Sequence, residues 1–562
     1  MPEVNAKRGS RLTARLWGLG CCLLLAACTA RGCGGDADGG ETPVMEPTLP
    51  PPTFRLAIVT DLKGYLEPCG CTSRPLGGID RVSARIATTR AAGPTLTLMA
   101  GDLFFSGQSH GPHAAAAHGT QAEDTPAPDG AASPSFAARA QAGQDALNAE
   151  AVADVVARFE VAAALPGAHD RAEPQALETL ATRARLPLVG REASEAVRRE
   201  VAGRSVLVLG ILEEEPRAAA AATRAQLDAP ANATRDLVVV LTRGGRRTAR
   251  SVAQVPGVHV VVLGGADVDE ALPPGSAGDA LVLHASRQGQ GVTVAGIYLP
   301  PPGSAPAGPI VDVSPWSAAA RRTTLEADIA ELSASIARWE QEGADAQQIE
   351  RQRGRLSGMQ AELAGGVPPP LPPAQLALAA TFFELPPDAP QDAEVTAAME
   401  ALARRVNEHN RVALADWAPE PVAAGEPHFV GSAACESCHS AAYTWWRGHP
   451  HGRAYSTLEV RHKQFNLSCV GCHVTGYLQP GGSTVTHLGD GALINVGCEN
   501  CHGPASAHVA SGGSVAPARR DVPASVCTGC HNPEHSDTFL YDAFRRTLLV
   551  PGHGLPTAGG TP

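Results

Sequence analysis

The residues of this chain that are best suited to chemistry are cysteines and histidines near its C-terminal end. Fourteen cysteines occur in 562 residues, and eight of them belong to four Cys-x-x-Cys-His motifs. Two thiols at this spacing can form thioether bonds to one haem, and the adjacent histidine can then bind the iron. The motifs therefore predict four c-type haems. The attachment residues are Cys435, Cys438, Cys469, Cys472, Cys498, Cys501, Cys527 and Cys530, and the proximal ligands are His439, His473, His502 and His531.

Zinc ribbons are the competing interpretation of Cys-x-x-Cys pairs. Structural zinc needs four cysteine or histidine ligands, but it does not need a histidine directly after each second cysteine. All four motifs of this chain have that histidine. Haem is therefore the better interpretation.

Each haem iron has a second axial position that another histidine can occupy. Eight histidines lie in or beside this region outside the motifs, which is enough for four bis-histidine haems. The residues alone leave open which of them are used. They are His428, His449, His451, His462, His487, His508, His535 and His553.

The N-terminal residues predict export. A basic stretch over 7–15 precedes a short apolar stretch over 16–27, which is too short for the roughly 20 residues of a membrane span. It ends in Leu-Ala-Ala followed by Cys28, which resembles a bacterial lipobox. We expect a lipoprotein signal peptide over 1–27 and lipidation of Cys28, although an ordinary signal peptide is the alternative. The lipid anchor would hold the protein to the membrane, on the periplasmic side of the inner membrane or on the outer membrane.

Charge and length restrict the remaining possibilities. Acidic residues outnumber basic residues by 57 to 45, so the chain lacks the basic footprint of a nucleic-acid-binding protein. We expect no nucleic-acid partner. At about 150 residues per domain, the length indicates three or four units.

The elements that must position these residues begin with an α/β domain over 53–312. Short apolar runs typical of strands alternate there with alanine- and arginine-rich helical stretches, including a helix around 145–160. Residues 106–144 interrupt the pattern and are predicted to be a disordered surface insertion. The predicted strands are 54–59, 96–99, 161–165, 206–211, 237–241, 258–263, 281–284 and 292–299.

The remaining segments separate this domain from the haem motifs. Apolar residues three or four apart between 325 and 339, and seven apart after Gly343, predict a helical hairpin. An amphipathic helix is expected after Asp392. The predicted segments are a flexible tether over 28–52, the helical hairpin over 313–366, a proline-rich spacer with the amphipathic helix over 367–426, a mostly α-helical and irregular haem domain over 427–540, and a tail over 541–562.

The motif region resembles the tetrahaem cytochrome c-554-like family of electron carriers. It contains Phe-Val-Gly-Ser-Ala-Ala-Cys-Glu-Ser-Cys-His, then a tryptophan followed by His-Pro-His, and later Cys-Glu-Asn-Cys-His-Gly-Pro-Ala-Ser-Ala-His. The resemblance implies electron transfer between a redox-protein donor and a redox-protein acceptor. It also implies His451 and His508 as distal ligands, with His462 and His535 as further candidates. One five-coordinate haem occurs in that family.

The α/β domain resembles calcineurin-like metallophosphatases and 5′-nucleotidases, which implies a metallophosphatase-like sandwich. The resemblance rests on five short stretches whose order along the chain agrees with that family. They are Thr60-Asp61-Leu62-Lys63, Gly101-Asp102, Gly167-Ala168-His169-Asp170, Leu241-Thr242-Arg243-Gly244 and Gly265-Ala266-Asp267-Val268.

The metal ligands of that family are mostly replaced in this chain. Asp61 and Asp102 remain as ligand positions, and His169 remains as the family's candidate general acid. Two carboxylates do not hold two divalent ions at ordinary affinity. We therefore expect a vestigial site with no dinuclear metal, in which Lys63 and Arg243 pair with the two carboxylates. No catalytic residue is assigned.

Two further cysteines, Cys69 and Cys71, follow the first of these stretches. They could form a disulfide, bind a soft metal or act as a redox pair, and the residues leave these possibilities open. A thiol site that exchanges electrons with the haems is the functional hypothesis.

Taken together, the sequence favours an exported, lipid-anchored tetrahaem cytochrome with an inactive metallophosphatase-like domain for docking or sensing. It is more consistent with an electron carrier than with a hydrolase. The alternatives are a multihaem reductase with one open-coordinate haem and an active metallophosphoesterase.

Overall fold

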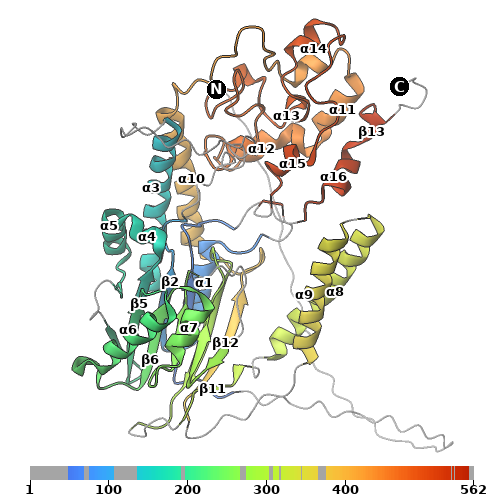
Figure 1. The fold of residues 1–562 in the computed structure, drawn as a ribbon. Coiled ribbons are helices and arrows are strands. Elements are labelled where there is room, and N and C mark those ends of the chain that lie inside the picture. Colours follow the sequence, from blue (N-terminus) through green and yellow to red (C-terminus); the bar gives the residue numbers. More distant parts are fainter. Residues whose placement is uncertain are drawn as a thin grey trace, which may run out of the picture. The chain divides into compact units, whose positions relative to one another are not determined.

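The protein was analysed as a computed structural model, shown in Figure 1. The described residues all lie in the second of two units, which begins at Thr48. They are 49–68, 75–106, 136–190, 196–265, 274–302, 308–314, 318–343, 345–364, 375–532, 535–536 and 538–555. Several predicted features lie outside them: the signal peptide, most of the tether, Cys28, Cys69, Cys71 and positions 266–268.

Two six-stranded mixed sheets form the α/β domain. The first sheet has the order β11 (Val311–Asp312), β12 (Ala377–Glu384), β10 (Gly291–Tyr298), β1 (Phe54–Thr60), β2 (Thr95–Gly101) and β3 (Val161–Pro166). The second has the order β4 (Val197–Val201), β5 (Arg204–Ile211), β6 (Leu237–Thr242), β7 (Val260–Leu263), β9 (Ala280–Leu283) and β8 (Gly275–Ala277). Strands β1, β2 and β3 run parallel, as do β5, β6, β7 and β9.

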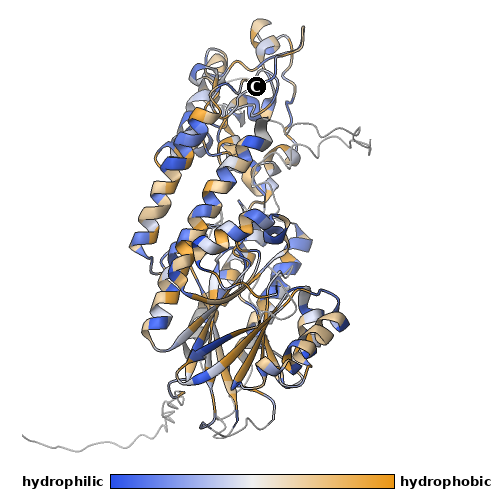
Figure 2. Cartoon of the chain, turned by 90° about the vertical axis from the view of Figure 1, so that its left-hand side faces the viewer, coloured by the Kyte–Doolittle hydropathy of each residue, from blue (hydrophilic) through white to orange (hydrophobic). Residues whose placement is uncertain are grey.

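The sheets pack face to face around a hydrophobic core that contains Leu56, Leu98, Val208 and Val239. Strand β6 is an apolar run buried along its whole length, as expected for a central parallel strand covered on both faces. Figure 2 shows the strands mainly in the hydrophobic colour and the helices with mixed colouring. The predicted α/β sandwich is therefore confirmed.

Helices cover the outer face of each sheet and give four layers. Helices α1 (Ile79–Ala91), α3 (Phe136–Val156), α5 (Pro174–Ala184) and α10 (Ala393–Ala413) pack on the first sheet. Helices α6 (Pro216–Asp228) and α7 (Gly245–Ala253) pack on the second. The shorter elements of this domain are α4 (Ala168–Ala172), η2 (Ala157–Phe159) and η3 (Pro230–Asn232).

The expected boundary of this domain at residue 312 is too early. Strand β12 pairs with β10 along its full length, so the segment interpreted as a spacer supplies a strand of the first sheet. The predicted helix after Asp392 is confirmed as α10, and the Asp392 carboxylate caps it by accepting the backbone N–H groups of Glu394 and Val395. Strand β4 was also missed, because its sequence, Val-Arg-Arg-Glu-Val, is mostly charged.

The predicted insertion is shorter than expected at its C-terminal side. Helix α3 begins at Phe136, and Gln144 is fully buried. Residues 107–135 lie outside the described part. The eight predicted strands are confirmed, as is the helical hairpin, which consists of α8 (Ala318–Gln341) and α9 (Ala346–Ala364). An ion pair between Arg353 and Glu340, at 2.7 Å, joins the two helices.

The motif region is built from short helices joined by irregular segments. Its own apolar core is small and includes Tyr455, Leu467, Val470 and Val474. The segment interpreted as a tail contains a helix, α16. The elements are η5 (Ser432–Cys435), α11 (Ser440–Gly448), η6 (Pro450–Arg453), α12 (Ala454–Glu459), η7 (Val470–Cys472), η8 (Gly489–Gly491), α13 (Cys498–His502), α14 (Ser506–Ala510), α15 (Ala524–Thr528), α16 (Tyr541–Leu548), β13 (Val550–Pro551) and β14 (Gly554–Leu555).

Helices α3 and α10 link the two regions through a buried polar network. The Gln144 side-chain oxygen accepts hydrogen bonds from the Asn410 amide at 2.7 Å and from the Leu467 backbone N–H at 3.0 Å. The Asn410 amide also donates to the Phe465 carbonyl, at 2.9 Å. These bonds fix the residues that directly precede Cys469.

Among the helices of the described residues, none combines the length and the apolar character that a membrane span needs.

Candidate functional site

The four motifs lie in short helical turns. Helix η5 ends at Cys435, η7 ends at Cys472, and α13 spans the whole third motif. A single helical turn brings positions i and i+3 to the same side, which suits the attachment of two thiols to one haem. Cys438 is exposed, and the other motif cysteines are partly buried.

Three motif histidines are oriented through their Nδ1 atoms. Nδ1 of His473 lies 2.7 Å from the Ala454 carbonyl oxygen, and Nδ1 of His502 lies 2.8 Å from that of Arg519. Nδ1 of His531 lies 3.2 Å from the Ser536 hydroxyl. A hydrogen bond at Nδ1 fixes the ring and leaves Nε2 available to a metal. Burial lowers the pKa of His473 and of His531, which favours the neutral imidazole that an iron ligand must be.

Three of the motif histidines face a second imidazole. Two imidazoles on one iron have ring centres about 6 Å apart, because each metal–nitrogen bond is about 2 Å long and each ring centre lies roughly 1 Å further away. The observed separations are 6.1 Å for His439 and His508, 6.1 Å for His531 and His451, and 6.4 Å for His502 and His553. Each of these distances suits one iron between two rings.

The second histidine of each pair also has features that suit an iron ligand, either an Nδ1 hydrogen bond or a lowered pKa. Nδ1 of His508 lies 2.6 Å from the Val515 carbonyl oxygen, and Nδ1 of His553 lies 2.6 Å from that of Leu548. Burial, with smaller effects from His449 and His531, lowers the pKa of His451 to about 4. His451 is therefore neutral at neutral pH.

Of the four histidines expected as distal ligands, the structure brings two opposite a motif histidine. His451 and His508 have such a partner, whereas His462 and His535 have none among the described residues. The third motif histidine, His502, faces His553. His553 was not singled out from the sequence, because it lies in the segment interpreted as a tail. The only sequence signal for it was its membership of the eight spare histidines. Within the described ranges no imidazole faces His473.

Cysteines of different motifs also contact each other through their thiol groups. The thiol of Cys435 is hydrogen-bonded with that of Cys498, and the thiol of Cys530 with that of Cys472. Motifs one and three are therefore neighbours, as are motifs two and four. The buried Glu499 carboxylate secures the first of these contacts, because it accepts the backbone N–H groups of Gly431 and Ala505 at 2.8 and 2.9 Å.

The side chains around the motifs fit flat aromatic groups. Phe539 stacks on His531 with ring centres 4.6 Å apart, and Trp445 stacks on His553 at 5.0 Å. Phe544 lies beside both Phe539 and His531 and is 39% exposed. Paired thiols, oriented imidazoles and these aromatic faces together fit covalently attached haem.

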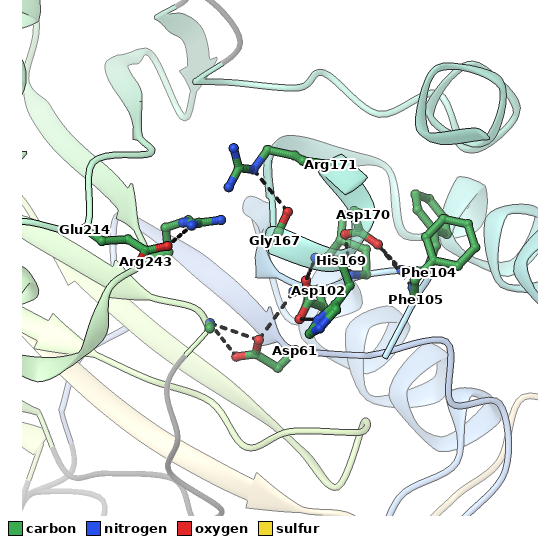
Figure 3. Close-up of polar contacts among 12 residues, drawn as sticks. Asp61, Asp102, Phe104, Phe105, Gly167, His169, Asp170, Arg171, Glu214 and Arg243 are labelled. Carbon is green, nitrogen blue, oxygen red and sulfur yellow. Dashed lines mark hydrogen bonds and ion pairs between the residues drawn. The ribbon is translucent and has the colours of Figure 1, made fainter. Parts of the chain in front are cut away.

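The second candidate site lies where parallel strands of the first sheet end. Asp61 directly follows β1, and its two carboxylate oxygens each lie 2.9 Å from the backbone N–H of Gly265 (Figure 3). The Asp102 backbone N–H also donates to Asp61, at 3.3 Å. Burial raises the pKa of Asp61 to about 7, although the Gly265 hydrogen bond and the charge of Lys63 oppose this shift. Gly101 is required here, since a Cβ on it would lie 2.2 Å from Asp61 Oδ1.

Asp102 and His169 form the other half of this site. Asp102 accepts the His169 backbone N–H at 2.9 Å and lies 2.8 Å from Nδ1 of the same residue. The neighbouring Asp170 carboxylate is buried and accepts three backbone N–H groups, from residues 103–105. The structure thus brings Asp61, Asp102 and His169 together, as the sequence predicted.

The expected ion pair of Arg243 with these carboxylates is wrong. Arg243 pairs instead with Glu214, which follows β5 and was not predicted from the sequence (Figure 3). Lys63 acts on Asp61 through its charge. In the described part of the chain, no group of three histidine, cysteine or acidic residues is arranged to hold a metal ion. Among the described residues the side chains of this site are therefore not arranged as a dinuclear metal centre, and positions 266–268 lie outside these residues.

Comparison with known proteins supports the interpretation of the motif region. Residues 434–503 match the family described as cytochrome c554 and c-prime. Cytochrome c-554 of Nitrosomonas europaea is 35% identical over 96 residues, which cover 14% of this chain and 40% of that protein. The C-terminal region is similar to c-554-type haem cytochromes. The chain spans less than half the length of this relative.

Solved structures similar to this chain include a sulfate thiohydrolase and two 5′-nucleotidases. A sulfate thiohydrolase, SoxB, from Thermus thermophilus has a TM-score of 0.39 and 12% identity, with 64% of this chain and 62% of that chain covered. A 5′-nucleotidase from Staphylococcus aureus, titled as putative, has a TM-score of 0.31 and 13% identity, with 43% and 50% covered. A 5′-nucleotidase from Candida albicans has a TM-score of 0.28 and 12% identity, with 45% and 49% covered.

Proposed function

We propose that this protein is an exported, lipid-anchored tetrahaem cytochrome that transfers electrons between redox proteins. The observation that carries the proposal is the set of three imidazole pairs at separations of 6.1 to 6.4 Å, each with one motif histidine. Haem supplies one-electron redox chemistry when it is bound. The chain supplies the thiols, the axial imidazoles and the packing around them.

Under this proposal three motifs hold bis-histidine haems. The axial pairs are His439 with His508, His502 with His553, and His531 with His451. Imidazole at both axial positions leaves an iron no open position, which suits electron transfer rather than substrate binding. The cysteine contacts between motifs one and three, and between motifs two and four, support two closely spaced haem pairs.

The second motif differs from the others and favours a second candidate function. No imidazole faces His473 among the described residues, and its Nδ1 is already engaged by the Ala454 carbonyl. A haem held there would keep one open position, as a reductase requires. The buried bonds from Gln144 and Asn410 hold the chain that leads into this motif.

Export and anchoring are parts of the same proposal. The basic and apolar N-terminal stretches before Cys28 support them, and so does covalent haem, which is attached outside the cytoplasm. Cys28→Ser should release the protein from the membrane fraction without changing its haem content. Retention of this variant in the membrane fraction would contradict lipidation of Cys28.

The deciding experiment counts haem on protein matured in a host with haem-attachment machinery. We expect four haems per chain by pyridine haemochrome. In the reduced spectrum, three haems should not bind carbon monoxide and one haem should bind it. Four unreactive haems would remove the reductase alternative, and fewer than four haems would contradict the tetrahaem assignment.

We further propose that the α/β domain does not hydrolyse phosphoesters through two metal ions. The pairing of Arg243 with Glu214, and the backbone N–H groups that occupy Asp61, support this. Activity towards p-nitrophenyl phosphate should stay at background with added Mn²⁺. Turnover accompanied by two bound metal ions per chain would contradict it.

A further inference from the structure

The vestigial metal site contains a buried guanidinium group whose donors are only partly used. The Arg243 side chain is 11% exposed, and Nη2 pairs with Glu214. Its Nε and Nη1 atoms are buried and have no hydrogen-bond partner among the described residues. Buried donors of a charged group almost always have an acceptor. Arg243 therefore has capacity for a further negatively charged partner.

A second guanidinium group lies close to the first. Nε of Arg171 donates to the Gly167 carbonyl at 3.2 Å, and no described residue accepts a hydrogen bond from its terminal nitrogens. Figure 3 shows the Arg171 and Arg243 guanidinium groups pointing into the same space beside Asp61 and Asp102. After burial, the charge of Arg171 is the next cause that lowers the pKa of Arg243. The two positively charged guanidinium groups repel each other, and an anion bound between them would offset that repulsion.

The nearby carboxylates offset the charge of this pair only in part, since Asp102 favours the charged form of Arg243 less than Arg171 opposes it. Asp61 accepts backbone N–H groups from Gly265 and Asp102, and Asp102 is occupied by His169. Glu214 contacts only one edge of the Arg243 guanidinium, and its own side chain is 58% exposed. The two arginines therefore keep donors that none of these acidic side chains uses.

We propose that Arg171 and Arg243 form a metal-independent binding site for a small oxyanion. Guanidinium donors match two oxygens of one phosphate- or sulfate-like group, so the ligand class is a phosphate, a phosphate monoester or a sulfur oxyanion. The basic side chains would then supply the positive charge that metal ions supply elsewhere. This inference is independent of the proposed electron transfer, since no haem residue contributes to it.

The test is isothermal titration of the full-length, haem-loaded protein in buffer with EDTA. The probes are inorganic phosphate, glycerol phosphate, sulfate and sulfite, with chloride as the reference anion. We expect one of them to bind with a stoichiometry of one. Whether the phosphates or the sulfur oxyanions bind more tightly would identify the class of ligand that the site prefers.

Three variants locate the binding. Arg171→Gln and Arg243→Met should each weaken it by about tenfold or more, because a hydrogen bond to a charged group is worth roughly that factor in affinity. Arg183→Gln is the matched control, because it removes another partly exposed arginine that is ion-paired with Asp154. It should bind the anion as the unsubstituted chain does.

Thermal unfolding separates lost binding from a lost fold. Arg243→Met should change the melting temperature little in anion-free buffer, since it removes two buried donors that lack acceptors and one ion pair to the largely exposed Glu214. It should abolish the rise in melting temperature that the bound anion causes. The proposal is overturned if no probe binds, if binding appears only with added Mn²⁺, or if both arginine variants bind as well as the control.

Discussion

The motif region and the α/β domain each bring together side chains that could do chemistry, and they differ in what holds their structure together. In the motif region the thiols, the imidazoles and their orienting hydrogen bonds are all present. In the α/β domain two carboxylates and a histidine lie together, and Arg243 pairs with Glu214. The sandwich does not depend on these side chains for its form, because its stability comes from the apolar core between its sheets.

The motif region depends on its chemistry much more strongly. Helices α11, α14, α15 and α16 bury no side chain. A region with so little apolar core needs another source of stability, and covalent cofactors supply one. The difference teaches that loss of ligands should be tolerated in the sandwich and not in the motif region.

The largest expected effect comes from removing one attachment pair. Cys498→Ala with Cys501→Ala should reduce the haem count from four to three and disorder the segment around α13 to α16. The matched change in the other region, Asp61→Asn with Asp102→Asn, should leave the haem count at four. Haem staining with circular dichroism measures both. Equal damage from the two double variants would break the comparison.

The next effect concerns one axial ligand. His553→Ala should convert one six-coordinate haem into one that binds carbon monoxide, because the ring facing His502 is lost. His535→Ala is the control and should leave the spectrum unchanged. The measurement is the carbon monoxide difference spectrum of the reduced protein. An unchanged spectrum for His553→Ala would remove this residue from the ligand set.

A smaller effect is expected where the two regions meet. Gln144→Ala leaves the Leu467 N–H and the Asn410 amide without their buried acceptor, which should cost about 1–3 kcal/mol of unfolding free energy. Gln141→Ala, on the same helix, removes only a bond to Asp145 and should cost little. Urea unfolding monitored by fluorescence and by haem absorbance measures both. If Gln144→Ala cost no more than the control, the network would not stabilise the junction.

The last prediction, of the smallest effect, concerns the pH dependence of stability. It depends on His259, a partly buried histidine of the α/β domain that is not paired with a second imidazole in the described part of the chain, as three of the motif histidines are. His259 accepts the Val238 backbone N–H at 2.9 Å, and burial, followed by the charge of Arg235, lowers its pKa to about 4, with Asp279 opposing. Its contribution to stability is present above about pH 6.5 and is lost as the pH falls towards 4. His259→Gln keeps an acceptor without a charge change. It should flatten the acid side of the stability curve between pH 6.5 and pH 4.

The control for this titration is His409→Gln, which changes an exposed histidine of α10. Unfolding free energies measured between pH 4 and 7 would show the same slope for this variant as for the unsubstituted chain. A slope unchanged by His259→Gln as well would mean that other groups cause the acid dependence.

Local chemistry was predictable from the sequence, and long-range partners were not. The attachment cysteines follow from a fixed spacing, and strands such as β6 follow from continuous apolar runs. His553 could not be assigned, because its partner His502 is distant along the chain and the fold alone brings the two together. Glu214 was missed as the partner of Arg243 for the same reason, since each follows a different strand. β12 was missed because the prolines before it suggested a spacer.

The Glu499 carboxylate has a consequence for the order of events during synthesis. It lies inside the third motif, yet it holds the chain just before the first motif at Gly431. This contact cannot form until the third motif has been synthesised. The chain at Gly431 is therefore fixed only after the first two motifs have been made.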